Sequence, residues 1–260
     1  MTERAGAYDF TSKGVIVTGG ARGVGRGITD AFLAAGATVV ICGRNEPDTL
    51  PAVGDNQARF VTADIRDPEQ IAPVVAAAVD GAGRLDVVVN NAGGSPYAHA
   101  ATASPRFTSS IISLNLIAPI NVAQQANAVM QEQDEGGSIL NIGSVSGLRP
   151  SPGTAAYGAA KAGLVNLTQS LAVEWAPRVR VNCVTGGLIE TEQAHLHYGD
   201  AEGVARVAAT VPMGRMATPH DIAEACLWLA SPGASYVTGA NITIHGGGEM
   251  PAFQDAANAQ

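Results

Sequence analysis

With 260 residues, 46% of them hydrophobic, the chain can form one globular domain with an ample core. Its formal net charge of -8 argues against nucleic acid and anionic membrane surfaces as main partners, because like charges repel. No apolar run approaches the roughly 18 residues of a membrane span. The segment from Met1 to Phe10 lacks the apolar stretch of a secretory signal. Since the three cysteines form no C-x-x-C pair, we expect reduced thiols in a cytoplasmic protein.

The first predicted elements are a strand, a glycine-rich turn and a helix. A short apolar run from Gly14 to Thr18 is typical of a strand buried on both faces, and a helical pattern ends before Gly36. Glycines between them allow a tight turn, and free N–H groups at a helix start attract phosphate. The predicted pyrophosphate site comprises Gly19, Ala21, Arg22, Gly23, Val24 and Gly25. The alternative is a glycine-rich turn without a ligand.

A second strand, from Thr38 to Cys42, completes a βαβ unit of roughly 30 residues. At its end, NAD-specific sites carry an acidic residue that binds the ribose 2′-hydroxyl, whereas this chain has Gly43 and Arg44. Arg44 and Arg22 are two candidate cations for a 2′-phosphate. The sequence therefore favours NADP(H) and leaves NAD(H) possible. The alternative for each arginine is a solvated surface charge.

Two further strands are predicted to end in polar residues. The run from Arg59 to Ala63 leads into Asp64 and Ile65, where the carboxylate can meet an adenine amino group. Asp67 is the expected cap of the helix that follows. A later buried strand leads into Asn90-Asn91-Ala92-Gly93, at the strand end where open parallel sheets bind ligands.

The segment Tyr157-Gly-Ala-Ala-Lys161 places a phenol and an ammonium one helical turn apart on one face. A nearby cation favours the phenolate, so Lys161 is expected to lower the pKa of Tyr157 and make it a usable general acid or base. Ser144 follows an apolar strand-like run, and its hydroxyl can face the same reacting oxygen. Alone, this spacing also fits a snorkelling lysine beside a half-buried tyrosine.

These motifs resemble those of the short-chain dehydrogenase/reductase family, and the resemblance covers nearly all of residues 14–248. It implies a single doubly wound Rossmann-type α/β domain of about seven parallel strands with helices on both faces. Residues 1–13 would then be an N-terminal segment and 249–260 a C-terminal tail. The motifs that carry the resemblance are Thr18-Gly19-x-x-x-Gly23-x-Gly25, Asp64, Asn90-Asn91-Ala92-Gly93, Asn115, Ser144 and Tyr157-x-x-x-Lys161.

The resemblance implies hydride transfer between a nicotinamide and a small-molecule carbonyl or secondary alcohol. Tyr157 would donate the proton and Ser144 would hold the oxygen. Lys161 would also bind the nicotinamide ribose, and Asn115 would fix a water that relays protons. Further implied cofactor contacts are Asn91, Ala92, Gly93, Ile189 and Thr191. No metal site is expected, because His195 and His197 lack a third ligand.

Two helices bear on assembly and on the site. The helix from Ser109 to Val122 is apolar nearly all round, and Pro119 should loosen it and free a carbonyl near Asn115. In similar proteins this helix and the Tyr157 helix, which should end near Trp175, pack across an interface, which implies a homotetramer or homodimer.

The sequence departs from the family pattern at two positions. Gly186 stands where proline is usual, which predicts a looser loop, and His245 replaces a common aspartate. The segment from Glu192 to Thr210 is the expected lid over the substrate.

The predicted substrate lining is mixed apolar with one cation, Arg149, and favours an alicyclic or acyl-thioester ketone. Its members are Ser95, Pro96, Tyr97, Leu148, Arg149, Pro150 and Leu188. The alternative function is a non-catalytic NADP(H)-binding sensor or scaffold on the same fold. Such a protein would typically have lost Tyr157 or Lys161, and this chain retains both.

Overall fold

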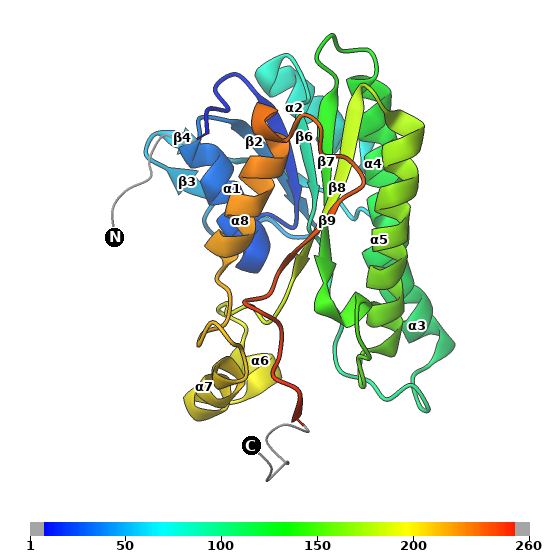
Figure 1. Cartoon of the computed structure of the whole chain (residues 1–260). Coiled ribbons are helices and arrows are strands. Elements are labelled where there is room, and N and C mark those ends of the chain that lie inside the picture. Colours follow the sequence, from blue (N-terminus) through cyan, green and yellow to red (C-terminus); the bar gives the residue numbers. More distant parts are fainter. Residues whose placement is uncertain (1–7, 253–260) are drawn as a thin grey trace.

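The computed structural model of the chain describes residues 8–252. Its centre is a seven-stranded sheet in which every neighbouring pair is parallel, in the order β5-β2-β1-β6-β7-β8-β9 (Figure 1). The expected doubly wound sheet is therefore confirmed. The seven strands are β1 (Gly14–Thr18), β2 (Thr38–Gly43), β5 (Arg59–Thr62), β6 (Val87–Asn90), β7 (Gly137–Ser144), β8 (Val179–Gly186) and β9 (Asn241–Ile244).

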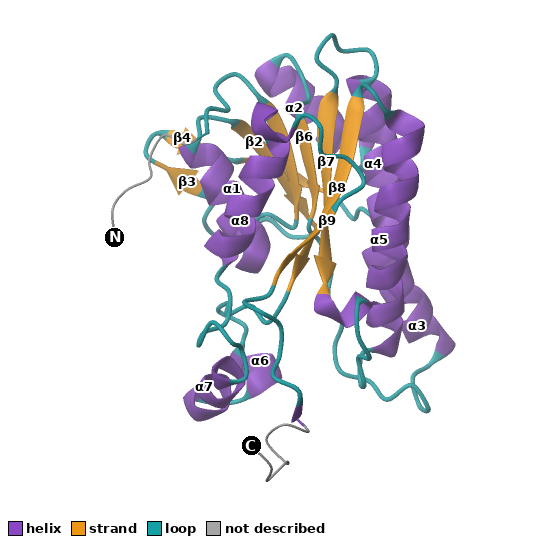
Figure 2. Cartoon of the chain, in the orientation of Figure 1, coloured by secondary structure: helices purple, strands orange, loops and turns teal. Residues whose placement is uncertain are grey.

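Helices cover both faces of the sheet (Figure 2). The pair α1 and α8 lies on one face, and α2, α4 and α5 lie on the other. The helices are α1 (Gly23–Ala34), α2 (Ala72–Ala82), α3 (Pro105–Ile112), α4 (Ala118–Met130), α5 (Ala155–Trp175), α6 (His195–Tyr198), α7 (Ala201–Ala209) and α8 (Pro219–Ala230). Short 3₁₀ turns span Pro68–Gln70, Val145–Gly147 and Pro232–Ala234.

The alternation of side chains along β1 explains why both faces are covered. Ile16 belongs to the core beneath α2, α4 and α5, whereas Val15 and Val17 belong to the core beneath α1 and α8. Successive strand residues point to opposite faces, so a continuous apolar strand needs a helical layer on each side. Asp67 caps the turn before α2 as expected, since its side chain accepts a hydrogen bond from the N–H of Glu69.

The helix around Asn115 is longer than predicted and is interrupted. It begins with α3 and ends with α4, and a π-helical turn, Ser113–Ile117, joins the two. Pro119 has no N–H for the carbonyl four residues earlier, which is that of Asn115. The predicted loosening near Pro119 is thus confirmed. A short antiparallel hairpin, β3 (Ala52–Val53) with β4 (Asn56–Gln57), was not predicted.

The two ends of the described chain contact the domain. The buried ring of Phe10 packs edge-on against Phe32 at a centroid distance of 5.0 Å. Near the other end, Glu249 pairs with Arg149, and Met250 N–H donates to the carbonyl of Thr210. The predicted tail therefore begins with residues that pack on the domain, while residues 253–260 lie outside the described part. Within residues 8–252, no helix is long and apolar enough to cross a bilayer.

The sheet order places the site. The chain passes from β1 outward to β2 and β5, then returns to β6 on the other side of β1. Open α/β sheets bind ligands beyond the carboxyl ends of the strands at such a switch point. The loops after β1 and β6 meet there, and the loops after β7 and β8 continue the same edge.

Candidate active site

The glycine turn after β1 has the geometry of a phosphate cradle. Gly19 and Gly23 have φ angles of +64° and +54°, a left-handed conformation that favours glycine. A Cβ on Gly25 would lie 2.3 Å from the carbonyl oxygen of Gly19, so the helix can approach the turn only without a side chain. The residue before α1, Arg22, forms no side-chain cap, and the Glu192 carboxylate accepts a hydrogen bond from the Gly23 N–H. The first turn of α1 thus binds an anionic group, which fits the pyrophosphate of a dinucleotide.

The predicted loop after β6 is bonded to this turn. Thr18 Oγ1 accepts hydrogen bonds from the N–H groups of Asn91 and Ala92, both at 3.0 Å. The Asn91 amide donates in return to the Thr18 carbonyl at 2.9 Å. A Cβ on Gly93 would come within 2.6 Å of Asn115 Oδ1 and 3.4 Å of Lys161 Nζ. This loop thus connects the cofactor cradle to the predicted catalytic residues.

The rim that would receive the adenosine half is exposed and charged. The guanidinium groups of Arg22 and Arg44 are exposed and form no hydrogen bond or ion pair with another described residue. Asp64 instead forms a short ion pair with Arg66, which holds the pKa of the Asp64 carboxyl below its ordinary value. The Ile65 side chain is buried in the core. The contacts of Asp64 and Ile65 with adenine remain predictions.

Ser144, Tyr157 and Lys161 come together at the carboxyl end of β7. Ser144 is the last residue of β7, and α5 supplies the other two from successive turns of one face. The Ser144 side chain lies near the Tyr157 phenol, and hydrogen bonding between them acts to lower the Tyr157 pKa. Lys161 Nζ lies 5.6 Å from the Tyr157 ring centroid and donates to the Ile142 carbonyl at 2.7 Å. The structure therefore brings the predicted hydroxyl pair and the cation into one cluster.

Burial dominates the electrostatics of this cluster. It lowers the pKa of Lys161 to about 8, because the charged ammonium is removed from water. Burial also raises the pKa of Tyr157, while the Ser144 hydrogen bond lowers it and the nearby Tyr198 raises it. The expected depression of the Tyr157 pKa by Lys161 is wrong for the protein alone. Desolvation of the phenolate outweighs the attraction of a lysine that lies over the ring.

Asn115 is fully buried in the π-helical turn and bonded to backbone on two sides. Its amide nitrogen donates to the carbonyls of Ile111 at 2.9 Å and Gly94 at 3.0 Å. Its Oδ1 accepts from the Gly94 N–H at 2.8 Å. These bonds hold the loop after β6 against the helix, which makes Asn115 a positioning residue. Its water-relay role remains a prediction.

The loop after β8 is held in place despite Gly186. Glu190 N–H donates to the Ala217 carbonyl at 2.8 Å, and Ala217 N–H donates to the Leu188 carbonyl at 2.9 Å. A Cβ on Gly186 would lie 2.7 Å from Ile189 Cδ1, so the glycine leaves space that Ile189 occupies. The expected looseness is therefore not observed. The cofactor contacts of Ile189 and Thr191 remain predictions.

Arg149 was expected to be an unpaired cation in the substrate lining, but it is paired with an acidic residue. Its guanidinium forms a short ion pair with Glu249, so it is not the lone cation expected in the substrate lining. Burial raises the pKa of Tyr198 in α6, and the Glu249 charge raises it further while Arg149 opposes this. These partners were missed because Glu249 lies 100 residues from Arg149 and no local motif links them. Within the described residues, no group of three or more His, Cys, Asp or Glu could hold a metal.

The comparisons with known proteins agree with this geometry. The family model described as enoyl-(acyl carrier protein) reductase matches residues 19–249. A 3-oxoacyl-[acyl-carrier-protein] reductase of Chlamydia muridarum is 36% identical over 92% of this chain and 98% of its own. An L-rhamnose 1-dehydrogenase (NAD(P)(+)) of Azotobacter vinelandii is 37% identical over 90% of this chain and 96% of its own.

A solved structure of a dehydrogenase shares the fold. The ligand-free aldohexose dehydrogenase of Thermoplasma acidophilum superposes with a TM-score of 0.85 at 28% identity, covering 96% of this chain and 97% of its own. The fold is thus shared with a dehydrogenase along nearly the whole chain. The chain belongs to the short-chain dehydrogenase/reductase family and is an NAD(P)-dependent oxidoreductase.

Proposed function

We propose that this protein is an NADP(H)-preferring reductase of a ketone, working reversibly on the matching secondary alcohol. The observation that carries the proposal is the cluster of Ser144 at the end of β7 with Tyr157 of α5, whose ring centroid lies 5.6 Å from the buried ammonium of Lys161. A hydroxyl pair next to a cation suits a reaction that builds negative charge on one oxygen and then protonates it.

The residues divide this work by position. When bound, the nicotinamide supplies the hydride. Ser144 donates a hydrogen bond to the carbonyl oxygen as negative charge develops there. Tyr157, whose raised pKa keeps it protonated near neutral pH, gives its proton to that oxygen. Lys161, with a pKa of about 8, is mostly charged at pH 7 and stabilises the phenolate that Tyr157 leaves behind.

Preference for NADP(H) is supported by the rim of the cradle. The end of β2 carries Gly43 and Arg44 rather than an acid, and the Arg44 and Arg22 side chains are exposed. Both are available for a 2′-phosphate, which pairs well with guanidinium groups. NAD(H) lacks that phosphate and would gain nothing from them.

The substrate side favours a neutral ketone. Leu148 and Tyr97 are exposed apolar residues of the predicted lining, with exposed fractions of 50% and 68%. Because Glu249 balances Arg149, this pair adds no net charge to the predicted substrate lining. An alicyclic ketone fits this character, and a 3-oxoacyl thioester is supported by the Chlamydia relative.

The proposal includes a cytoplasmic homotetramer or homodimer with one domain over residues 14–248. Exposed apolar side chains on two helices support assembly. They include Ile117 beside α4 and Val173 of α5, with exposed fractions of 44% and 82%. Apolar surface of this kind is typical of protein interfaces.

The test measures NADPH and NADH consumption at 340 nm with a panel of cyclic ketones, 3-oxoacyl thioesters and aldoses, and NADPH binding by fluorescence. Turnover of a cyclic ketone or 3-oxoacyl thioester, faster with NADPH, is the expected result. NADPH binding without turnover on any substrate would favour the alternative, a sensor or scaffold. Faster turnover with NADH would overturn the proposed cofactor preference.

A further inference from the structure

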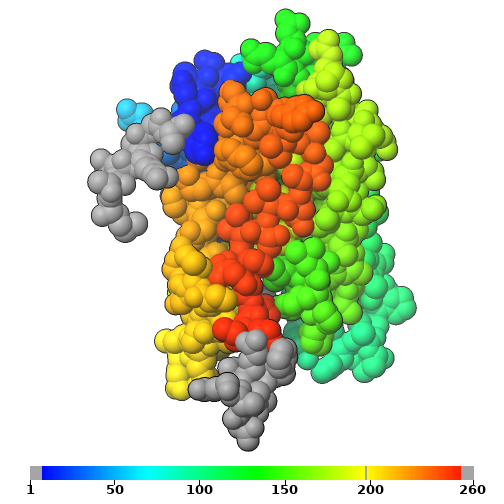
Figure 3. Space-filling view, in the orientation of Figure 1, coloured from blue at the N-terminus to red at the C-terminus, as the bar shows by residue number. Residues whose placement is uncertain are grey.

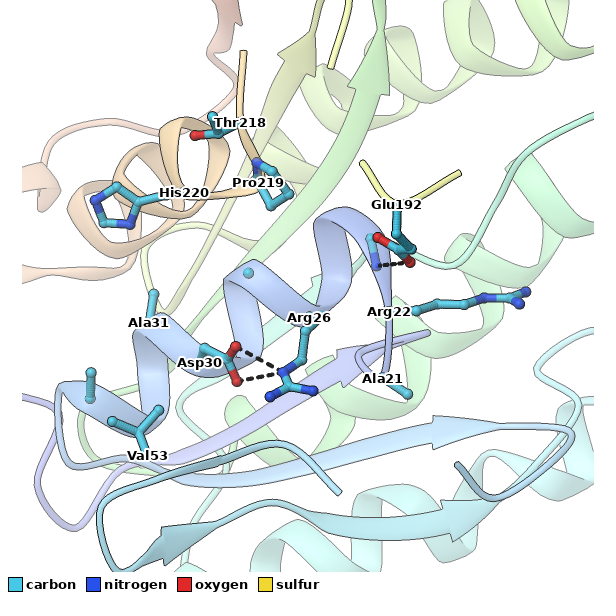
Figure 4. A pocket seen from close by; sticks show the side chains of 13 residues that line it. Ala21, Arg22, Arg26, Asp30, Ala31, Val53, Glu192, Thr218, Pro219 and His220 are labelled. Carbon is cyan, nitrogen blue, oxygen red and sulfur yellow. Dashed lines mark hydrogen bonds and ion pairs between the residues drawn. The ribbon is translucent and has the colours of Figure 1, made fainter. Parts of the chain in front are cut away.

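A glutamate from the lid lies on the phosphate cradle. Glu192 directly follows Thr191, and its carboxylate accepts a hydrogen bond from the Gly23 N–H at 3.0 Å (Figure 4). The atoms nearest to a Cβ placed on Gly23 are Thr191 Cγ2 and Glu192 Oε1, at 3.9 and 4.0 Å. Two segments 169 residues apart are therefore in contact through one charged group.

The N–H that Glu192 uses is one that the cradle offers to an anion. Gly23 is the first residue of α1, where the partial positive charge of the helix is concentrated. No side chain caps this turn from within the helix start. A carboxylate at this position takes the place that a phosphate oxygen would occupy, and it carries the same sign of charge.

Neighbouring charges do not cancel that of Glu192. Arg26, one turn along α1, is bound to Asp30 through two hydrogen bonds of 2.8 Å. Figure 4 shows this pair facing each other beside the helix, while the Arg22 side chain extends away from it. The Arg26 charge is therefore already balanced by Asp30 and does not neutralise Glu192. A phosphate that approaches Gly23 meets the negative charge of the Glu192 carboxylate.

The contact can open without unfolding the loop. Glu192 is exposed, so releasing its carboxylate to water costs little. The backbone before it is anchored by the hydrogen bond from Glu190 N–H to the Ala217 carbonyl. A change of the Glu192 side-chain rotamer is enough to free the Gly23 N–H. The segment that begins at Glu192 then loses this hydrogen bond to the cradle.

We propose that Glu192 sets the affinity for the dinucleotide by competing with its pyrophosphate for the N-terminus of α1. The carboxylate holds the start of the lid on the cradle in the free protein and leaves Gly23 when the cofactor binds. This inference rests on the proposed function, because it assumes that the pyrophosphate binds at the predicted turn. Each binding event displaces a like charge, so the wild-type affinity is lower than the cradle alone would give.

The test compares dissociation constants for NADPH, measured by fluorescence, in the wild type, Glu192→Gln and Glu190→Gln. Glutamine keeps an acceptor for Gly23 but removes the charge, so Glu192→Gln should bind NADPH about three- to tenfold more tightly. The control residue Glu190 is exposed, and its carboxylate has no hydrogen-bond or ion-pair partner in the described chain. Glu190→Gln should bind like the wild type.

A second ligand distinguishes binding at the pyrophosphate site from binding at the 2′-phosphate site. Adenosine 2′-monophosphate carries only the 2′-phosphate, so its dissociation constant should be the same in all three proteins. Equal or weaker NADPH binding by Glu192→Gln would overturn the inference while leaving the proposed function intact. If the wild type binds no NADPH at all, the proposed function itself fails.

Discussion

The inner and outer halves of the site differ in how tightly their side chains are held. Asn115 and Lys161 are buried and bonded to backbone carbonyls that the fold fixes. Arg22, Arg44 and Glu192 are exposed, and of their side chains only that of Glu192 forms a hydrogen bond within the described chain. The space-filling view shows the segment around residue 200, in yellow, beside the last described residues, in red (Figure 3).

This difference separates two properties of the enzyme. On the proposed function, the inner half would deliver the proton, because its donors cannot rearrange without breaking buried hydrogen bonds. The outer half would then select the dinucleotide, because exposed charges are free to meet a phosphate. Substitutions inside should therefore cost stability or rate, and substitutions on the rim should change affinity alone.

The largest expected effect on stability is at Asn115. Replacement by leucine removes three hydrogen bonds, two to the part-buried backbone of Gly94 and one to the buried carbonyl of Ile111. We expect Asn115→Leu to lower the free energy of unfolding by about 3 kcal/mol. Urea unfolding would measure it, with the exposed Asn166→Ala of α5 as a control that should stay within about 0.5 kcal/mol. A wild-type unfolding curve for Asn115→Leu would contradict the positioning role.

Next in size is the loss of a hydroxyl at Ser144. Without a donor for the developing negative charge, Ser144→Ala should reduce kcat by about 100-fold. Ser144→Thr keeps a hydroxyl and should retain much more activity. The comparison of both variants by steady-state kinetics is the check, and equal losses in the two would mean that packing rather than the hydroxyl matters.

A smaller effect is expected when kcat/KM for NADPH is measured as a function of pH. The pKa of about 8 for Lys161 means that the fraction of charged lysine falls above pH 8. The pKa of Tyr157 is raised, so the phenol keeps its proton in this range. For ketone reduction, kcat/KM for NADPH should decline about tenfold per pH unit above pH 8. In Lys161→Arg the guanidinium stays charged, and the decline should move to higher pH. A flat wild-type profile up to pH 10 would refute this assignment.

The smallest effect is expected on the rim. Arg44→Ala should weaken NADPH binding by about tenfold, because one charge-assisted contact to the 2′-phosphate is lost. NADH binding should change by less than about twofold. Arg59→Ala, which removes an exposed arginine from the adjacent β5, is the matched control. Equal losses for the two dinucleotides would show that Arg44 is an ordinary surface charge.

The elements that could be predicted were those with strong local signals. The bounds of β1 match the apolar run from Gly14 to Thr18, and α5 ends at Trp175 as expected. The cluster of Ser144 and Tyr157 follows from two short motifs, since parallel strands present their carboxyl ends at one edge.

Long-range pairs and burial could not be predicted in this way. The contacts of Arg149 with Glu249 and of Gly23 with Glu192 join segments 100 and 169 residues apart, and no periodicity marks them. The direction of the Tyr157 pKa shift depends on how much water the folded site excludes, which a motif does not encode. Sequence patterns thus located the chemistry but not the electrostatic state of its groups.

The most direct test of the proton-donor assignment is a paired measurement on Tyr157→Phe. Phenylalanine keeps the ring beside Lys161 and removes only the hydroxyl. Turnover at 340 nm should fall by about 1000-fold, while the NADPH dissociation constant should stay within about twofold of the wild type. Retained turnover with unchanged binding would contradict the central claim that Tyr157 delivers the proton.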